Sequence, residues 1–155
     1  MLIKVALLLI LCARSAMADF VTPLKSLEIS SPFGMRKDPI TREVTMHEGI
    51  DVKADPGTPI YAVAAGKVVF SGLYRGYGNL VVIRHNAELT SHYGHLGGAL
   101  PKVGSMVTEG QVIGTLGRSG RATGPHLHFE LRINGDAKDP VLYFQNHKIL
   151  KQFEE

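Results

Sequence analysis

Cysteine is nearly absent from this 155-residue chain, in which Cys12 is the only one. Cys12 lies in a segment that we expect to be removed from the mature protein. A mature chain without cysteine can form no disulfide bond and offers no thiolate to a metal ion. Any metal site must therefore be built from histidine, aspartate or glutamate.

Residues 1–18 have the three parts of a secretory signal peptide. Lys4 supplies the positive charge, residues 5–11 form the apolar run, and residues 16–18 (Ala-Met-Ala) form a small-x-small cleavage site. Arg14 ends the apolar stretch before it reaches the roughly 20 residues that a membrane-spanning helix needs. We expect cleavage after residue 18, export to the periplasm or the medium, and no membrane attachment afterwards. A lipoprotein site at the single cysteine is the alternative.

An excess of charge of one sign is also missing. The chain has 17 basic and 14 acidic residues, and removal of residues 1–18 takes Lys4 and Arg14 with it, leaving 15 basic against 14 acidic. A nearly neutral mature chain lacks the basic footprint of a nucleic-acid-binding protein. We therefore expect no nucleic-acid partner.

No long stretch has the 3.6-residue hydrophobic period of a helix. Short β-branched segments punctuated by glycine and proline recur instead, for example at residues 79–85, 89–96 and 107–116. This pattern predicts an all-β fold, a compact antiparallel sheet arranged as a sandwich or barrel with little helix. The glycine and prolines within residues 31–40 predict no regular element there.

We expect one domain after the signal peptide. It comprises a lead-in at residues 19–30, a main domain at residues 31–143 and a C-terminal tail at residues 144–155. The end of the chain, from residue 143 onward, has room for one short helix.

Two histidines alternate with apolar residues after a glycine-rich turn. On an extended strand His126 and His128 face one way, while Leu127 and Phe129 face the other. One face of the strand would then carry the histidines of a reactive site, and the other face would pack into the core. By itself, the pair is equally typical of an edge strand with two surface histidines.

His47 and Asp51 form a second spacing far upstream. Gly49 between them argues against a helix, and a straight strand would separate them by about 13 Å. Two ligands of one metal ion have donor atoms within about 4 Å of each other, so the segment must bend, and Gly49 is where it can. Two histidines and a carboxylate are the ligand types of a catalytic zinc site with one position open to water.

A third segment, residues 91–96, contains His92 and His95. Strand alternation predicts that Tyr93 and His95 share one face and that His92 lies on the other. Which face looks toward a metal stays open at this point. We interpret His92 as a solvated or hydrogen-bonded histidine, and His85 likewise as having no role in the site.

Three ordered motifs carry a family resemblance: His47-x-x-x-Asp51, Tyr93-Gly94-His95-Leu96, and the run from Thr123 to Glu130. They resemble the LytM/lysostaphin-type zinc metallopeptidases, which cut peptidoglycan cross-bridges, over about residues 31–143. The resemblance implies that His47, Asp51 and His128 bind one zinc ion and that His95 and His126 are the catalytic histidines. It also implies the family's duplicated hybrid motif fold.

We therefore expect a monomeric, exported zinc metalloendopeptidase that cuts cross-links or stem peptides of peptidoglycan by means of a zinc-activated water. Glu48 is an alternative general base, and Glu130 is either an outer acceptor for an imidazole or a plain strand carboxylate. A relative that has lost catalysis and serves as an envelope scaffold or amidase activator is a rival interpretation. A carrier or saccharide-binding β-domain is another.

Overall fold

The structure is a computed structural model that describes residues 20–38, 40–98 and 100–144. The expected signal peptide, and all but the first residue of the expected tail, lie outside the described residues. In chain order the elements are β1 (Glu28–Ser31), β2 (Gly34–Lys37), β3 (Val44–His47), β4 (Ile50–Lys53), β5 (Pro59–Tyr61), β6 (Gly66–Leu73), η1 (Arg75–Tyr77), β7 (Asn79–Arg84), β8 (Leu89–Leu96), β9 (Met106–Val107), β10 (Val112–Thr115), β11 (His126–Ile133), β12 (Asp136–Lys138) and η2 (Pro140–Tyr143).

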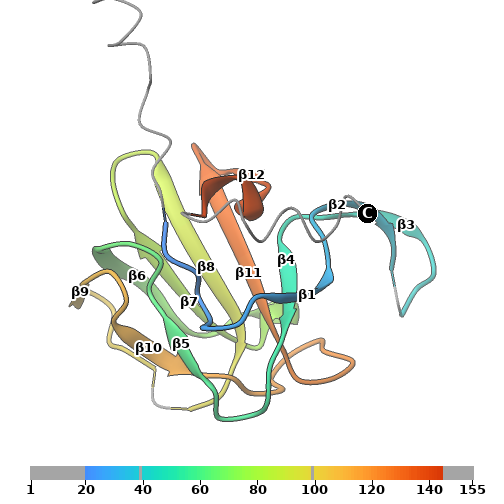
Figure 1. Cartoon of the computed structure of the whole chain (residues 1–155), viewed down its shortest axis with the longest axis horizontal. Helices are drawn as coiled ribbons and strands as arrows, with labels where there is room; N and C mark the ends of the chain where they lie inside the picture. The colour runs from blue at the N-terminus through green and yellow to red at the C-terminus, as the bar shows by residue number, and fades with distance from the viewer. Residues whose placement is uncertain (1–19, 39, 99, 145–155) are drawn as a thin grey trace, which may run out of the picture.

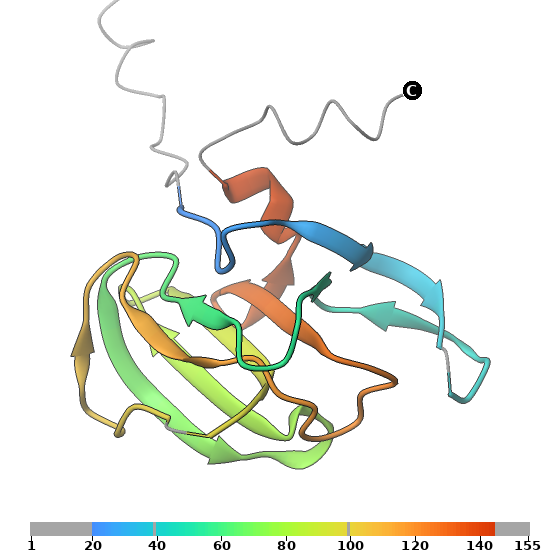
Figure 2. The ribbon, with the colours of Figure 1, turned by 60° about the horizontal axis from the view of Figure 1, so that its bottom comes forward.

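One large antiparallel sheet dominates the fold (Figure 1). Its strands run in the order β1-β4-β11-β8-β7-β6-β9, and β12 pairs with β11. The small β5–β10 sheet lies across the inner face of this sheet (Figure 2), and the core fills the space between them with side chains such as Ile60, Ile113 and Phe129. Among the described residues helix is limited to the short 3-10 turns η1 and η2. The predicted all-β antiparallel architecture is confirmed.

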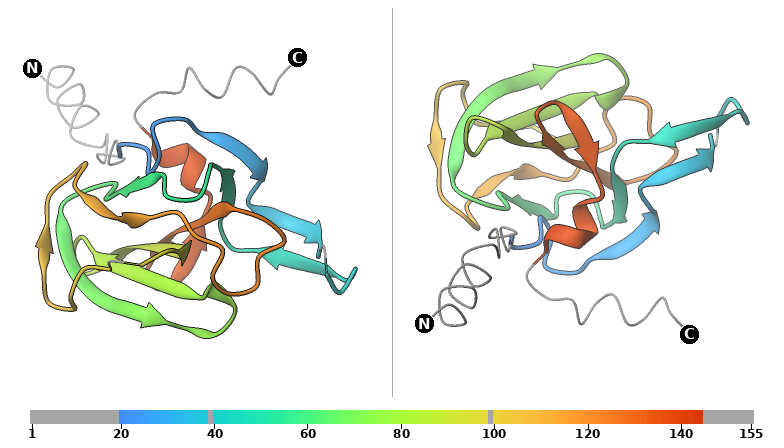
Figure 3. Two further views of the ribbon diagram at one scale, coloured as in Figure 1. Left: turned by 90° about the horizontal axis from the view of Figure 1, so that it is seen from below. Right: turned by 90° about the horizontal axis from the view of Figure 1, so that it is seen from above.

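The β2–β3 hairpin contradicts one sequence prediction. Residues 34–37, expected to be irregular, form β2 because residues 44–47 offer them an antiparallel partner, with Gly34 opposite His47. The hairpin projects from the body of the domain (Figure 3), and its Met35 and Val44 side chains are each 68% exposed. His47 thus stands at the base of the hairpin, where β3 ends.

The segment expected as a lead-in contributes to the same core. Phe20 and Leu24 are buried, and β1 begins at Glu28 and pairs with β4. None of the helices in the described part of the chain has the length and apolar character to cross a membrane.

Candidate metal centre and active site

The pairing of β4 with β11 creates the centre. Asp51 on β4 lies opposite His128 on β11, although the two are 77 positions apart in the chain. The expected bend between His47 and Asp51 is present, because β3 ends at His47 and β4 begins at Ile50. Gly49 is required there, since a Cβ at this position would lie 2.3 Å from the carbonyl oxygen of Phe129.

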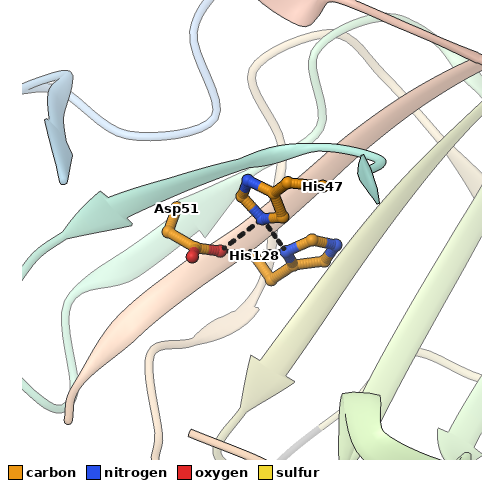
Figure 4. A group of neighbouring side chains, drawn as sticks. All are labelled: His47, Asp51 and His128. Carbon is orange, nitrogen blue, oxygen red and sulfur yellow. Dashed lines mark hydrogen bonds and ion pairs between the residues drawn. The ribbon is translucent and has the colours of Figure 1, made fainter. Parts of the chain in front are cut away.

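Three donor atoms converge at this place (Figure 4). Nε2 of His47 lies 3.2 Å from Oδ1 of Asp51 and 3.2 Å from Nδ1 of His128, which is itself 2.9 Å from the same Oδ1. Ligands about 2.1 Å from a tetrahedral zinc ion are about 3.4 Å apart, so this donor set fits a small divalent cation. The structure therefore brings together His47, Asp51 and His128, the three residues expected as ligands.

In both His47 and His128, the ring nitrogen that points away from the centre also forms a hydrogen bond. Nδ1–H of His47 donates to the carbonyl oxygen of Pro32 at 2.7 Å, and Nε2–H of His128 donates to Oε1 of Glu130 at 2.9 Å. In the neutral rings these bonds select the tautomers that point a lone pair at the centre, an arrangement typical of metal-binding histidines. Of the two interpretations of Glu130, the geometry favours the outer acceptor.

Glu130 is 1% exposed and fully engaged. Besides His128, it accepts hydrogen bonds from the hydroxyl of Tyr77 at 2.6 Å and from Nε of Arg132 at 2.7 Å. Burial raises its pKa, but the hydrogen bonds from His128, Arg132 and Tyr77 outweigh burial and lower the pKa to about 2. Glu130 is therefore a carboxylate at neutral pH.

Asp51 and His128 stabilise each other's charged forms. Burial opposes ionisation of Asp51, yet hydrogen bonds from His128 and His47 hold its pKa far below the ordinary value. Burial likewise opposes protonation of His128, but its hydrogen bonds to Asp51 and Glu130 raise its pKa to about 9. A divalent cation bound by His128 and Asp51 would therefore take the place of the proton that His128 otherwise shares with Asp51. Arg36 approaches the far oxygen of Asp51, with its guanidinium 3.4 Å from Oδ2.

His95 and His126 flank the three ligand candidates. Their ring centroids are 4.8 Å apart, and both side chains line the cavity of about 500 Å³ that contains the ligand candidates. Nδ1–H of His95 donates to the carbonyl of Ser119 at 2.8 Å, and Nδ1–H of His126 donates to the carbonyl of Gly124 at 2.9 Å. In each ring Nε2 is the nitrogen left for proton transfer or hydrogen bonding. Burial lowers the pKa of His95 to about 4.

The position of His95 contradicts the predicted alternation. Tyr93 points into the core, where its hydroxyl accepts from the backbone N–H of Val63, whereas His95 faces the cavity. A bulge separates them: Asn79 pairs with Leu96 and Val81 pairs with Tyr93, so three positions of β8 match two of β7. His95 itself has φ +60°, a left-handed conformation that turns its side chain to the face of His126.

The remaining sequence candidates lie outside the centre. Nε2 of His92 is 3.1 Å from the hydroxyl of Thr90, and both ring nitrogens of His85 are engaged, by Ala65 and Ser91. Glu48, the alternative base, forms an ion pair with Arg132 at 2.7 Å and does not line the cavity.

Sequence reasoning assigned no role to Tyr77, Arg36 or Ser119. Tyr77 and Arg36 reach Glu130 and Asp51, residues 53 and 15 positions away in the chain. Ser119 acts through its carbonyl oxygen, a group that every residue type possesses. No local sequence signal marks such residues.

Comparison with protein families places the chain among peptidases. The model of peptidase family M23 matches residues 45–140. The chain is 47% identical over 121 residues to a DD-carboxypeptidase/endopeptidase of Neisseria meningitidis, Mpg, which covers 78% of this chain. It is 44% identical over 120 residues to the peptidoglycan DD-endopeptidase ShyC of Vibrio cholerae, which covers 77% of this chain. The matched part is 28% of the length of each relative.

Solved structures share the fold. A zinc-containing peptidase from Vibrio cholerae superposes with a TM-score of 0.72 at 38% identity and covers 78% of this chain and 39% of that chain. The catalytic domain of lysostaphin from Staphylococcus simulans superposes with a TM-score of 0.70 at 32% identity and covers 77% of this chain and 93% of that domain. The fold is thus the LytM-like one that the resemblance implied.

Proposed function

The chain belongs to peptidase family M23, and on that premise we propose that it is an exported zinc metalloendopeptidase that hydrolyses cross-links or stem peptides of bacterial peptidoglycan. The observation that carries the proposal is the convergence of donor atoms from His47, Asp51 and His128 beside two further imidazoles. The names of the relatives, which include a peptidoglycan DD-endopeptidase, support the choice of substrate.

We assign His47, Asp51 and His128 as the ligands of one zinc ion per chain. Zinc in such a site polarises a carbonyl group and lowers the pKa of a bound water from 15.7 to about 7. The chain's own contribution is to hold the donors. Pro32 and Glu130 fix the two imidazoles, and Arg36 engages Oδ2 of Asp51, which leaves Oδ1 turned toward His47 and His128.

His95 and His126 are the proposed catalytic residues. Because Nδ1–H of each ring donates to a backbone carbonyl, Nε2 of a neutral ring can accept a proton from the attacking water and later return it to the leaving amine. Nε2–H of a protonated ring can donate to the oxygen of the scissile carbonyl as negative charge develops there. One of His95 and His126 serves as the proton acceptor, and the other donates to the oxygen of the scissile carbonyl.

Expected export by residues 1–18 would place the enzyme in the periplasm or outside the cell, where peptidoglycan lies. We propose that it acts there as a monomer. The alternative, an inactive envelope scaffold or amidase activator, is disfavoured because loss of catalysis removes selection on the site residues. Here all five positions hold histidine or aspartate and line one cavity.

The test is digestion of isolated cell walls by the purified, zinc-loaded protein. We expect new soluble muropeptides in mass spectra, and a comparison of Gram-negative with glycine-bridged walls would identify the bond. The matched control is the His126→Ala protein, which should bind zinc and release nothing. Unchanged muropeptides from both walls would contradict the enzyme proposal.

A further inference from the structure

A second groove lies on the sheet face that carries the metal-centre side chains. Adjacent strands place Phe70 opposite Val82, Val82 opposite His92, and His92 opposite Glu130, so these four side chains form a row across β6, β7, β8 and β11. The groove over this row has a volume of about 830 Å³. Tyr77 lines both this groove and the metal-centre cavity, which makes the two adjacent.

Three aromatic rings lead from the metal centre into this groove. The ring centroid of Tyr77 is 5.5 Å from that of His128 and 6.1 Å from that of Tyr74. The ring centroid of Phe70 is in turn 5.6 Å from that of Tyr74. Tyr74 is 43% exposed, and the guanidinium of Arg75 lies 5.6 Å from its ring centroid. Exposed aromatic rings next to a catalytic groove are typical of ligand contact rather than of a monomer's solvent-facing surface.

The remaining lining is suited to a polar ligand with an apolar face, and the exposed Arg75 and Glu88 are its charged members besides Arg132. Leu80 and Val82 form a nearly buried apolar floor, and the hydrogen-bonding groups of Thr90, His92 and Asn134 stand around it. The charged group of Arg132 is already paired with Glu130 and Glu48. A pyranose ring matches this combination, because its C–H face packs on aromatic rings while its hydroxyls need hydrogen-bond partners at the rim.

We propose that the groove lined by Phe70, Tyr74 and Tyr77 binds the glycan strand of peptidoglycan while a stem peptide reaches the metal centre. The proposal rests on the proposed function for the identity of the polymer. It adds a saccharide-binding site that is distinct from the peptide-cleaving centre and joined to it through Tyr77.

The spacing between the two sites agrees with the shape of the substrate. In peptidoglycan the stem peptide is attached to a sugar, and four extended residues span at most about 13–14 Å. The ring-to-ring steps of 5.5 Å from His128 to Tyr77 and 6.1 Å from Tyr77 to Tyr74 together stay within this reach. A stem peptide whose fourth residue lies at the metal centre would therefore carry its sugar into the groove.

The first experiment measures binding without catalysis. Peptide-free glycan strands are titrated into the full chain in the presence of a chelator, and binding is followed by NMR shifts and calorimetry. We expect shifts concentrated at the groove and affinity about tenfold weaker in Tyr74→Ala, the loss expected for one aromatic contact. Leu73→Ala is the matched control, because Leu73 is 79% exposed next to Tyr74 but does not line the groove.

The second experiment separates the two sites kinetically. Tyr74→Ala should raise KM for intact walls severalfold and leave kcat/KM for sugar-free cross-linked peptides unchanged. An equal loss on both substrates would contradict glycan binding and indicate a disturbed metal centre.

Several other outcomes would overturn the inference. They are absence of glycan binding by a chain that does cleave walls, equal losses in Tyr74→Ala and Leu73→Ala, or self-association that Tyr74→Ala abolishes, which would make a second copy the occupant. Glycan binding by a chain that cleaves no wall would instead refute the proposed function and leave the saccharide site standing.

Discussion

Oε1 of Glu130 lies 2.9 Å from Nε2 of His128, on the side of the imidazole opposite Asp51. Glu130→Gln keeps a hydrogen-bond acceptor next to Nε2 of His128 but removes the negative charge that makes His128 a stronger metal ligand. We expect zinc affinity to fall by about 10–100-fold, as is usual for loss of a partner behind a ligand. Competition with a chelator measures the change.

Glu48→Gln is the matched control for this prediction. Glu48 shares the Arg132 ion pair with Glu130 but makes no contact with His128. An equal loss of zinc affinity in the two variants would show that the effect comes from Arg132 rather than from the bond to His128.

His128→Ala and His126→Ala should separate metal binding from catalysis. His128 contributes a donor atom to the cluster, so its alanine variant should retain no stoichiometric zinc after dialysis. Nε2 of His126 lies 3.6 Å from Oδ1 of Asp51, outside the cluster, so His126→Ala should keep about one zinc and lose on the order of 10²–10⁴ in kcat. Metal analysis and wall digestion test both. Complete zinc loss in His126→Ala would make the ligand assignment wrong.

His92 should make stability depend on pH. Burial lowers its pKa to about 4, against about 6.5 in an unfolded chain. Between these values the unfolded chain binds the proton and the folded chain does not. The contribution of the neutral, buried His92 to the free energy of unfolding is therefore fully present above pH 6.5 and is lost as the pH falls toward 4.

In urea unfolding of the chelated protein, the free energy of unfolding should drop between pH 7 and pH 5 by about 1–2 kcal/mol more in the natural chain than in His92→Gln. The glutamine keeps a polar group next to Thr90 but has no proton to bind in this range. Parallel pH curves for the two proteins would refute the prediction.

The loop that holds His95 depends on a close backbone contact between two glycines. A Cβ at Gly120, which has φ +78°, would lie 2.3 Å from the backbone nitrogen of Gly78. Gly120→Ala should therefore displace Ser119, whose carbonyl accepts from His95, and reduce both stability and wall cleavage. The free energy of unfolding should fall by more than the roughly 1 kcal/mol expected for the positive φ alone.

Gly104→Ala is the control that measures how much the positive φ alone lowers the free energy of unfolding. Gly104 has φ +91°, and a Cβ there would have nothing within 4 Å. Equal destabilisation of the two variants, measured by urea unfolding, would mean that the Gly78–Gly120 contact is unimportant.

Local sequence patterns were sufficient to predict much of this fold and of the candidate site. Alternation placed His126 and His128 on one face of β11, and the distance limit on two ligands predicted the break at Gly49. The hairpin β2–β3 was not predictable in this way, because residues 34–37 become a strand only through their pairing with residues 44–47.

The orientation of His95 could not be predicted either. Regular alternation assigns it to the face of Tyr93, and only the pairing with β7 reveals the extra residue in β8. The partners of Glu130 were equally hidden, since Tyr77 meets it through the tertiary fold.

The bulge in β8 makes this end of the strand sensitive to chain length rather than to residue type. Deleting Gly94 would match β8 to β7 residue for residue, and His95 would then take the place of Gly94 opposite His128, where a Cβ would lie 3.2 Å from the ring of Tyr77 and the imidazole could no longer stand beside His126. A homologue one residue shorter here would retain the complete donor cluster but would lack one of its two flanking histidines. Insertions and deletions in this strand are therefore a sign of altered activity among relatives that a comparison of residue types at the metal ligands would miss.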